Sequence, residues 1–280
     1  MSYLITGATG AIGRHIVNQL VAAGKEVHAL TRKPEQANLP ASVKVFAGGL
    51  AANTLQEGTF KGVKSIFLFP AYGDIKPFLS RAKTAGVEHV VLLSSLAAAA
   101  EFPRDLGSPS YLHHRALEQV VEESGIAYTF LRPGSFANNL RFWAYTIKTA
   151  KAVYGPYPQS AQALIHEADV AAVAVAALTT EGHMGATYAL TGPESLTQAN
   201  QLKTIGAAIG QELTYCTISP EQFTQSMSQF MPADVIKMML DYWCDTVEQP
   251  DVVRSTVEQI TGRPARTLAQ WAADHVSDFI

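Results

Sequence analysis

The 280-residue sequence predicts an α/β protein built on a doubly wound parallel sheet, from two observations along its first half. Short apolar runs alternate there with segments whose apolar residues recur at helical spacing, the pattern of strands joined by crossover helices. The runs are almost continuously apolar, which is typical of strands that are covered on both faces. We therefore expect a Rossmann-type sheet between two helical layers, followed by a smaller, mainly helical C-terminal lobe.

The expected strands are six runs of three to five residues that end near turn-forming or polar positions. They are Tyr3–Ile5, Glu26–Leu30, Val43–Ala47, Ser65–Phe69, His89–Leu93 and Ala127–Leu131. Helices are expected to end at Gly24, Gly86 and Gly125, because glycine commonly terminates a helix. After Arg132 the alternation breaks, and we expect one apolar helix capped by Asp169 and one further strand, Thr187–Leu190.

Composition restricts the class of protein. The chain is 48% hydrophobic and 16% charged with a net charge of −3, which fits a sizeable core and gives no basic footprint for nucleic acid. Cys216 and Cys244 lie far from other ligands at metal spacing, so we expect no metal site and two buried thiols in a reducing compartment. The apolar run Val170–Leu178 is too short to cross a bilayer, and the first strand begins almost at once, without a signal peptide. We expect a cytoplasmic monomer or homodimer that acts on a small molecule, without contact to nucleic acid or membrane.

A glycine-rich turn between the first strand and the first helix is the most informative motif. Residues 6–13 read Thr-Gly-Ala-Thr-Gly-Ala-Ile-Gly. Gly7 permits the tight turn, Gly10 lets the backbone approach a pyrophosphate, and Gly13 lets the helix pack close to the strand. The alternative is a turn that binds no ligand. The residues expected at the pyrophosphate are Gly7, Thr9, Gly10, Ala11, Ile12 and Gly13. Residues 1–136 are therefore expected to form a nucleotide-binding domain, and 137–280 a lobe interleaved with the last strands.

The end of the second strand indicates which nicotinamide cofactor is bound. An NAD-specific site usually has a carboxylate there, whereas this chain has Thr31, Arg32 and Lys33. A guanidinium can hold a 2′-phosphate through two hydrogen bonds, so Arg32 favours NADP, with NAD also possible. The alternative is a pair of solvated surface cations.

Several segments together resemble the NmrA-like group of atypical short-chain dehydrogenases/reductases. They are the doubled serine Ser94-Ser95, the segment from Leu131 to Asn139, and the helix-to-strand signature from His114 to Phe130. Residues 262–267, Gly-Arg-Pro-Ala-Arg-Thr, resemble a bacterial branch with azoreductase-like and triphenylmethane-reductase-like members. The resemblance implies a nicotinamide cofactor and either small-molecule reduction or redox sensing. One departure is Gly48-Gly49, where the group often has an aspartate near the adenine.

Further site residues follow from this resemblance and from the position of loops at the carboxyl ends of parallel strands. Expected cofactor contacts are Phe69, Pro70, Ser94, Pro133, Gly134 and Phe136. Expected substrate-side residues are Asn139, Phe142 and Trp143. Asn139 could instead cap a helix, and the aromatic residues, Tyr145 included, could equally form the core of the lobe.

The expected catalytic machinery is incomplete. The family typically uses a serine, a tyrosine and a lysine that lowers the tyrosine pKa. Ser95 matches the serine, and Tyr111 with Arg115 has the one-turn spacing of the pair, yet the ungapped register places Ser110 and His114 there instead. We favour this second register and take Ser95, His114 and Tyr111 as catalytic candidates.

Function follows from these features as a prediction. We expect an NADPH-preferring reductase that transfers hydride to an electrophilic aromatic molecule such as a quinone or dye, because such an acceptor needs little acid catalysis. The alternative is an NAD(P)-binding redox sensor without turnover, and a weaker one is an epimerase that uses a bound cofactor.

Overall fold

The computed structural model describes residues 1–50 and 55–280, which divide into two compact units. Unit 1 comprises Met1–Ala99, Leu112–Pro133 and Glu167–Ala189, and unit 2 comprises Ala100–Tyr111, Gly134–His166 and Leu190–Ile280. The domain division expected after residue 136 stays a prediction, because contacts within a folded chain do not reveal which segments fold independently.

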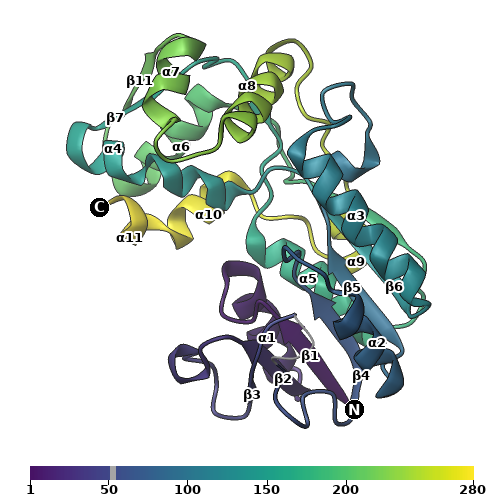
Figure 1. The fold of residues 1–280 in the computed structure, drawn as a ribbon. Coiled ribbons are helices and arrows are strands. Elements are labelled where there is room, and N and C mark those ends of the chain that lie inside the picture. The colour runs from purple at the N-terminus through teal and green to yellow at the C-terminus, as the bar shows by residue number, and fades with distance from the viewer. Residues whose placement is uncertain (51–54) are drawn as a thin grey trace. The chain divides into compact units, whose positions relative to one another are not determined.

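A seven-stranded sheet contains the strands that the sequence predicts. Its strands are β1 (Ser2–Thr6), β2 (Glu26–Thr31), β3 (Lys44–Ala47), β4 (Val63–Leu68), β5 (His89–Leu93), β6 (Ala127–Pro133) and β9 (Thr187–Leu190). The strand order is β3-β2-β1-β4-β5-β6-β9, and β1 pairs in parallel with both β2 and β4 (Figure 1). The order therefore reverses between β1 and β4, and ligands of open α/β sheets bind at the carboxyl ends of strands at such a point. The predicted fold class is confirmed.

Helices cover both faces of this sheet. They are α1 (Ala11–Ala22), α2 (Lys76–Thr84), α3 (Pro109–Ser124) and α5 (Glu167–Thr179), with short 3-10 helices at Pro34–Gln36 and Leu96–Ala99. Phe78 of α2 and Val121 of α3 pack with Leu4 and Ile66 in one fully buried cluster. The opposite face is covered by α1 and α5, which contact each other, and α5 also contacts β4, β5 and β6. Burial on both faces explains why the strands are continuously apolar.

Unit 2 is mainly helical, as predicted for the C-terminal lobe. Its helices are α4 (Ala144–Ala150), α6 (Gln198–Ile209), α7 (Pro220–Met227), α8 (Ala233–Glu248), α9 (Thr256–Thr261), α10 (Leu268–Asp274) and α11 (Val276–Phe279), with a 3-10 helix at Ala137–Trp143. Two strand pairs join them: β7 (Ala152–Gly155) with β11 (Thr214–Thr217), and β8 (Ala161–Gln162) with β10 (Leu196–Thr197). One core surrounds the fully buried Trp271, and a second forms where Phe223 of α7 meets Ile236 of α8.

Two local predictions are wrong. Asp169 does not cap α5, because the helix begins at Glu167 and Asp169 lies buried within its first turn. The positive end of the helix dipole favours a carboxylate at the N-cap and also within the first turn, so an aspartate near a helix start does not show which of the two positions it occupies. The two cysteines are not the buried thiols that we expected, since Cys216 is only partly buried and Cys244 is exposed. Cys244 is exposed because α8 is amphipathic and Cys244 lies on the same side of it as Asp241.

No helix in the described part of the chain is long and apolar enough to cross a membrane.

Candidate active site

The glycine turn has the close packing that its sequence predicts. Gly7 has φ +63°, and a Cβ atom there would lie 2.9 Å from Cβ of Phe69. A Cβ on Gly13 would lie 2.1 Å from the Gly7 carbonyl oxygen and 2.8 Å from Cα of Ala8, so only glycine fits. Gly10 is less restricted, since its added Cβ would meet only the Gly7 oxygen, at 3.3 Å. The packing of the protein itself therefore requires glycine at positions 7 and 13, whereas the glycine at position 10 has a cause other than packing.

This turn fits a cofactor pyrophosphate. It leads directly into α1, whose N-cap residue Gly10 has no side chain that could bond the first-turn N–H groups. Backbone N–H groups at a helix N-terminus, together with the helix dipole, bind phosphate well. A small residue at position 10 leaves room for the close approach of a ligand.

Thr6 connects the glycine turn to the end of β4. Its hydroxyl donates a hydrogen bond to the Phe67 carbonyl at 3.1 Å and accepts one from the backbone N–H of Phe69 at 2.7 Å. Phe69 is thereby held against Gly7 with 42% of its surface exposed. The structure thus brings two predicted cofactor residues together, and Pro70 follows directly.

Arg14 organises the loop after β2, a role that the sequence did not suggest. Its guanidinium donates to the carbonyl oxygens of Thr9, Ala37 and Asn38, at 3.0, 2.9 and 2.9 Å. The three bonds join the glycine turn to the segment that follows Arg32, and each guanidinium nitrogen of Arg14 donates one of them. A basic residue in the first turn of a helix looks like an ordinary surface cation in sequence, so no local signal distinguishes it.

Arg32 and Lys33 both lie exposed at the carboxyl end of β2. Thr31 accepts a hydrogen bond from the Lys33 backbone N–H at 3.3 Å, and its carbonyl accepts one from Gly48 at 2.9 Å. Within the described residues, the Arg32 side chain has no hydrogen bond or ion pair. Its guanidinium is therefore available to an anion.

A buried carboxylate joins β5, β6 and α3. Glu118 is fully buried and accepts hydrogen bonds from the Ser94 hydroxyl at 2.6 Å and from Nε and Nη2 of Arg132 at 2.8 and 2.7 Å. Arg115 donates a further bond from one turn earlier on the same helix. Burial by itself raises the pKa of Glu118, but the hydrogen bonds from Arg132, Ser94 and Arg115 outweigh it and hold that pKa below its ordinary value. We call these four residues the Glu118 cluster.

The Glu118 cluster bears on the open question of register. Because the Arg115 guanidinium is directed at Glu118, it is engaged elsewhere than in a pair with Tyr111. Ser94 is 3% exposed, its hydroxyl donates to Glu118 and its backbone N–H donates to the Leu131 carbonyl at 2.7 Å, so its predicted cofactor contact would use the backbone carbonyl. Ser95 is half-buried, and its hydroxyl oxygen accepts a bond from the Ala97 N–H at 3.3 Å.

The adjacent histidines of α3 lie in an aromatic row. Tyr72 stacks on His113 at 4.3 Å between ring centroids, and His113 meets the His114 ring edge-on at 5.1 Å. Burial and, to a smaller extent, the neighbouring His113 lower the pKa of His114 to about 4, against a small opposing effect of the Glu118 charge. Its Nδ1 is buried without a hydrogen-bond partner among the described residues. At neutral pH the His114 ring is thus an uncharged group that can give or accept a hydrogen bond, not a cationic acid.

In unit 2 the segment after β6 begins a hydrogen-bonded chain that sequence reasoning missed. Ser135 donates to the Tyr242 hydroxyl at 3.2 Å, and Tyr242 donates to Oδ2 of Asp251. Oδ2 also accepts from the Ala163 N–H at 3.2 Å, and Arg104 lies 4.0 Å from the other carboxylate oxygen. Burial and the Asp251 charge raise the pKa of Tyr242 well above its ordinary value. We call Ser135, Tyr242 and Asp251 the hydroxyl chain.

The other residues predicted in this segment have varied surroundings. Pro133 is buried at the end of β6, and the Gly134 N–H donates to the Leu190 carbonyl at 2.9 Å. Phe136 forms an isolated parallel bridge with Ile165. The contact of these three residues with the nicotinamide stays a prediction.

The substrate-side candidates separate into packed and exposed residues. Asn139 lies exposed inside a 3-10 helix, so it is not the helix cap that we considered as an alternative. Phe142 and Tyr145 are 46% and 75% exposed. Trp143 packs against the core around Trp271 and meets the Tyr215 ring edge-on, as the lobe-core alternative predicts. Of the three expected substrate residues, Trp143 therefore has an evident packing role.

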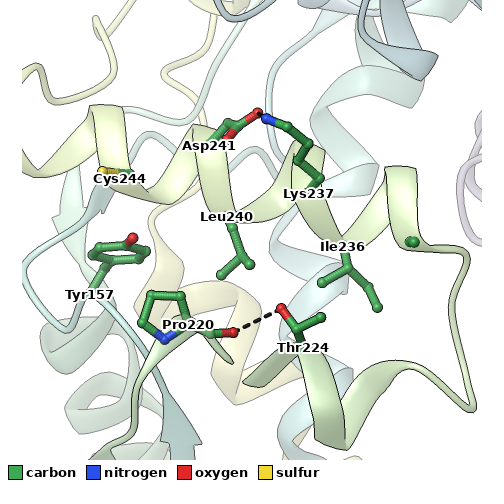
Figure 2. Close-up of a pocket in the computed structure, with 9 residues that line it drawn as sticks. Tyr157, Pro220, Thr224, Ile236, Lys237, Leu240, Asp241 and Cys244 are labelled. Atoms are coloured by element: carbon green, nitrogen blue, oxygen red, sulfur yellow. Dashed lines mark hydrogen bonds and ion pairs between the residues drawn. The ribbon is translucent and has the colours of Figure 1, made fainter. Parts of the chain in front are cut away.

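A cavity of about 370 Å³ lies between α7 and α8 in unit 2, and no predicted site residue lines it (Figure 2). Leu240 and Ile236 form its apolar side, and Tyr157 and Cys244 close one end. Lys237 and Asp241 pair with each other above it at 2.6 Å. Because these charges neutralise one another, the cavity offers no unpaired charge to a ligand.

Comparison with known proteins identifies the class to which this fold and this turn belong. Residues 7–181 match a family described as NAD(P)H-binding, so the chain belongs to that family. The NAD(P)H azoreductase of Xenophilus azovorans is 35% identical over 287 residues, covering 99% of this chain and 98% of the relative. The (4-alkanoyl-5-oxo-2,5-dihydrofuran-3-yl)methyl phosphate reductase of Streptomyces griseus is 34% identical over 282 residues, with the same coverage.

Solved structures with lower identity share the fold. A quinone oxidoreductase of Escherichia coli complexed with NADPH has a TM-score of 0.77 and 23% identity, covering 97% of this chain and 99% of that one. Triphenylmethane reductase of Citrobacter sp. with NADP(H) has a TM-score of 0.77 and 19% identity, covering 99% and 100%. NmrA, a negative transcriptional regulator solved with NADP, has a TM-score of 0.73 and 18% identity, covering 99% and 95%. The predicted resemblance, the NAD(P) cofactor and the oxidoreductase class are confirmed.

Proposed function

We propose that this protein is an NADPH-preferring reductase that transfers hydride to an electron-poor conjugated double bond in a small molecule. The two relatives above 30% identity are named as reductases, of azo compounds and of an oxo-dihydrofuran phosphate. An N=N bond between aryl groups and a C=C bond conjugated with a carbonyl are both electrophilic before any proton arrives. Quinones and cationic dyes share this property, so the expected substrates belong to one chemical class.

The observation that carries the cofactor preference is the exposed Arg32 at the end of β2. The two residues directly after this strand are Arg32 and Lys33 instead of a carboxylate, and Arg32 has no partner among the residues that the structure describes. A guanidinium in this position suits the 2′-phosphate of NADPH, which NADH lacks. Lys33, which follows Arg32, can add a point charge, whereas all three guanidinium nitrogens of Arg14 donate to carbonyl oxygens.

The chemistry of the candidate catalytic residues supports an acceptor that needs little acid catalysis. When bound, NADPH supplies the hydride. His114 is uncharged at neutral pH, so it can orient an acceptor by a hydrogen bond but does not present a cationic acid. Arg115 is held by Glu118 instead of lowering the pKa of a tyrosine. Ser95, His114 and Tyr111 therefore remain proposed as orienting groups, and positioning of the cofactor supplies most of the rate.

The test is NADPH oxidation by the purified chain against four acceptors: a quinone, an azo dye, a cationic triphenylmethane dye and an α,β-unsaturated lactone. We expect turnover with at least one acceptor, and a lower KM for NADPH than for NADH. Tight NADPH binding without turnover of any acceptor would contradict the proposal and would favour the redox-sensor alternative. That alternative rests on the fold shared with NmrA.

A further inference from the structure

Arg14 bridges two segments of unit 1 that lie far apart in the sequence. Its Nε donates to the Thr9 carbonyl in the glycine turn, and its Nη1 and Nη2 donate to the carbonyls of Asn38 and Ala37. Its own backbone is held in the first turn of α1, where its N–H donates to the Gly10 carbonyl at 3.0 Å. One guanidinium therefore connects the turn expected at the pyrophosphate with the segment beyond the residue expected at the 2′-phosphate.

The segment after Arg32 is a short unit with its own hydrogen bonds. The Lys33 carbonyl accepts from the Gln36 N–H at 3.1 Å, and the Pro34 carbonyl accepts from the Ala37 N–H at 3.2 Å, which closes one 3-10 turn. The proline ring also fixes one backbone angle of this turn. Because the turn is internally bonded, the place where its far end is held determines where Lys33 lies at its near end.

Arg14 holds this far end through two adjacent carbonyl groups. Ala37 is 2% exposed, and a buried backbone carbonyl needs a donor within the protein. Asn38 has φ +45°, a left-handed conformation that residues with a side chain keep only where surrounding contacts maintain it. The bonds from Nη2 and Nη1 of Arg14 act at these two residues.

Arg32 therefore lies between two held points. On one side the Thr31 carbonyl accepts from the Gly48 N–H at 2.9 Å, and on the other Lys33 begins the 3-10 turn. Arg32 is exposed, so its backbone position largely determines which point its guanidinium can reach. Arg14 controls that position from the side that follows β2.

We propose that Arg14 is a positioning residue for NADPH recognition, which fixes the segment after Arg32 and thereby the place from which Arg32 binds the 2′-phosphate. The inference rests on the proposed function, since it requires that Arg32 bind this phosphate. Arg14 acts through Arg32 because its own three nitrogens are directed at carbonyl oxygens. The glycine turn has a bond of its own, from the Gly10 N–H to the Gly7 carbonyl at 3.0 Å, so loss of Arg14 affects the 2′-phosphate more than the pyrophosphate.

The experiment measures NADPH and NADH binding by isothermal titration for the full chain and its variants. Arg14→Met keeps the length of the side chain and removes the guanidinium. It should weaken NADPH binding by about three- to tenfold, since a misplaced Arg32 loses part of a charge-assisted bond, and NADH binding by less than about twofold. Arg14→Lys keeps the charge, but one ammonium does not reproduce the planar fork that spans three carbonyls, so it should also lose most of the preference.

A double-mutant cycle separates positioning from direct contact. If Arg14 acts through Arg32, adding Arg14→Met to Arg32→Ala should change the ratio of NADPH to NADH affinity no further. A further loss of the same size in that background would overturn the inference, because Arg14 would then bind the phosphate itself. Full preference in Arg14→Lys would also overturn it, because charge alone would suffice. Equal weakening of both cofactors by Arg14→Met would do the same, because it indicates a purely structural role.

Arg81→Met is the matched control, since Arg81 is an exposed arginine of unit 1 in the last turn of α2. Its variant should keep the wild-type preference, and circular dichroism and Tm check that each variant is folded. If Arg14→Met is too unstable to titrate, Arg14→Lys, which retains one donor for these carbonyls, carries the test. If Arg32→Ala removes the preference while Arg14→Met keeps it, the inference fails and the proposed function stands. A wild type that binds NADPH no more tightly than NADH would overturn both.

Discussion

Replacement of Glu118 by glutamine tests whether the Glu118 cluster stabilises unit 1. The carboxylate is fully buried and accepts bonds from Ser94, Arg115 and Arg132, the last through two nitrogens. Glu118→Gln keeps the size of the side chain but leaves two guanidinium groups without their counter-charge. The variant therefore isolates the charge from the packing.

The expected loss is large. Breaking a buried ion pair by removal of one partner typically costs about 3–5 kcal/mol, and the amide oxygen retains part of the hydrogen bonding, so we expect roughly 3 kcal/mol. For a chain of this size that corresponds to about 6–12 °C in Tm. The control on the same helix is Glu123→Gln, because the ion pair of Glu123 with Lys76 is exposed and screened by solvent and should contribute little to stability.

The stabilisation should also depend on pH in a defined direction. Hydrogen bonds from the cluster lower the pKa of Glu118 below the ordinary value of 4.5 that it regains on unfolding. Its contribution is therefore fully present above about pH 4.5 and is lost as pH falls through the folded-state pKa. Urea unfolding of wild type and Glu118→Gln at several pH values measures this. A difference below about 1 kcal/mol at pH 7.5, or one that stays constant into strong acid, would refute the reasoning.

Four further substitutions test the cofactor site and the histidine. Arg32→Ala should weaken NADPH binding by about tenfold or more and hardly change NADH binding, because a charge-assisted bond to phosphate contributes about 1.5–3 kcal/mol; equal losses in titrations with both cofactors would sink the NADPH assignment. Gly10→Ala should stay folded, because its Cβ would meet only one atom, at 3.3 Å, but it should bind NADPH at least about tenfold more weakly. Gly13→Ala should instead lower Tm markedly, because its Cβ would lie 2.1 Å from a carbonyl oxygen. His114→Gln should leave the shape of the kcat/KM profile unchanged between pH 6 and 8, because the wild-type pKa is about 4; a limb near pH 6.5 that the variant lacks would show that the ring titrates in the working range.

The sequence predicted the features of this protein that depend on residues within one short segment of the chain. The strand, glycine turn and helix around Gly7 and Gly13 follow from residues within one short segment, and the structure gives each glycine a steric reason. The two polar clusters were not predictable in this way. Glu118 meets Ser94 and Arg132 only after β5, α3 and β6 have packed together, and no sequence spacing predicts this contact.

The same reason explains what was missed in unit 2. Tyr242 lies on an amphipathic helix and Asp251 lies just beyond it, both more than 100 residues from Ser135. The motif around Ser135 drew attention to its segment, but the direction of its hydrogen bond depends on partners that only the fold supplies. Trp143 packs against the core around Trp271, as the lobe-core alternative predicts, and its role beside a substrate stays a prediction.

Transfer of deuterium tests the central claim most directly. NADPH deuterated at the transferable C4 position is incubated with the purified chain and a cationic triphenylmethane dye, and the product is analysed by mass spectrometry. The dye is suitable because hydride adds to its central carbon, where a C–D bond does not exchange with water and no proton is required. The account predicts one deuterium on that carbon at a rate that falls when Arg32 is replaced by alanine. If that dye, the quinone, the azo dye and the lactone are all left unreduced while NADPH binds tightly, the protein is not a reductase of this class.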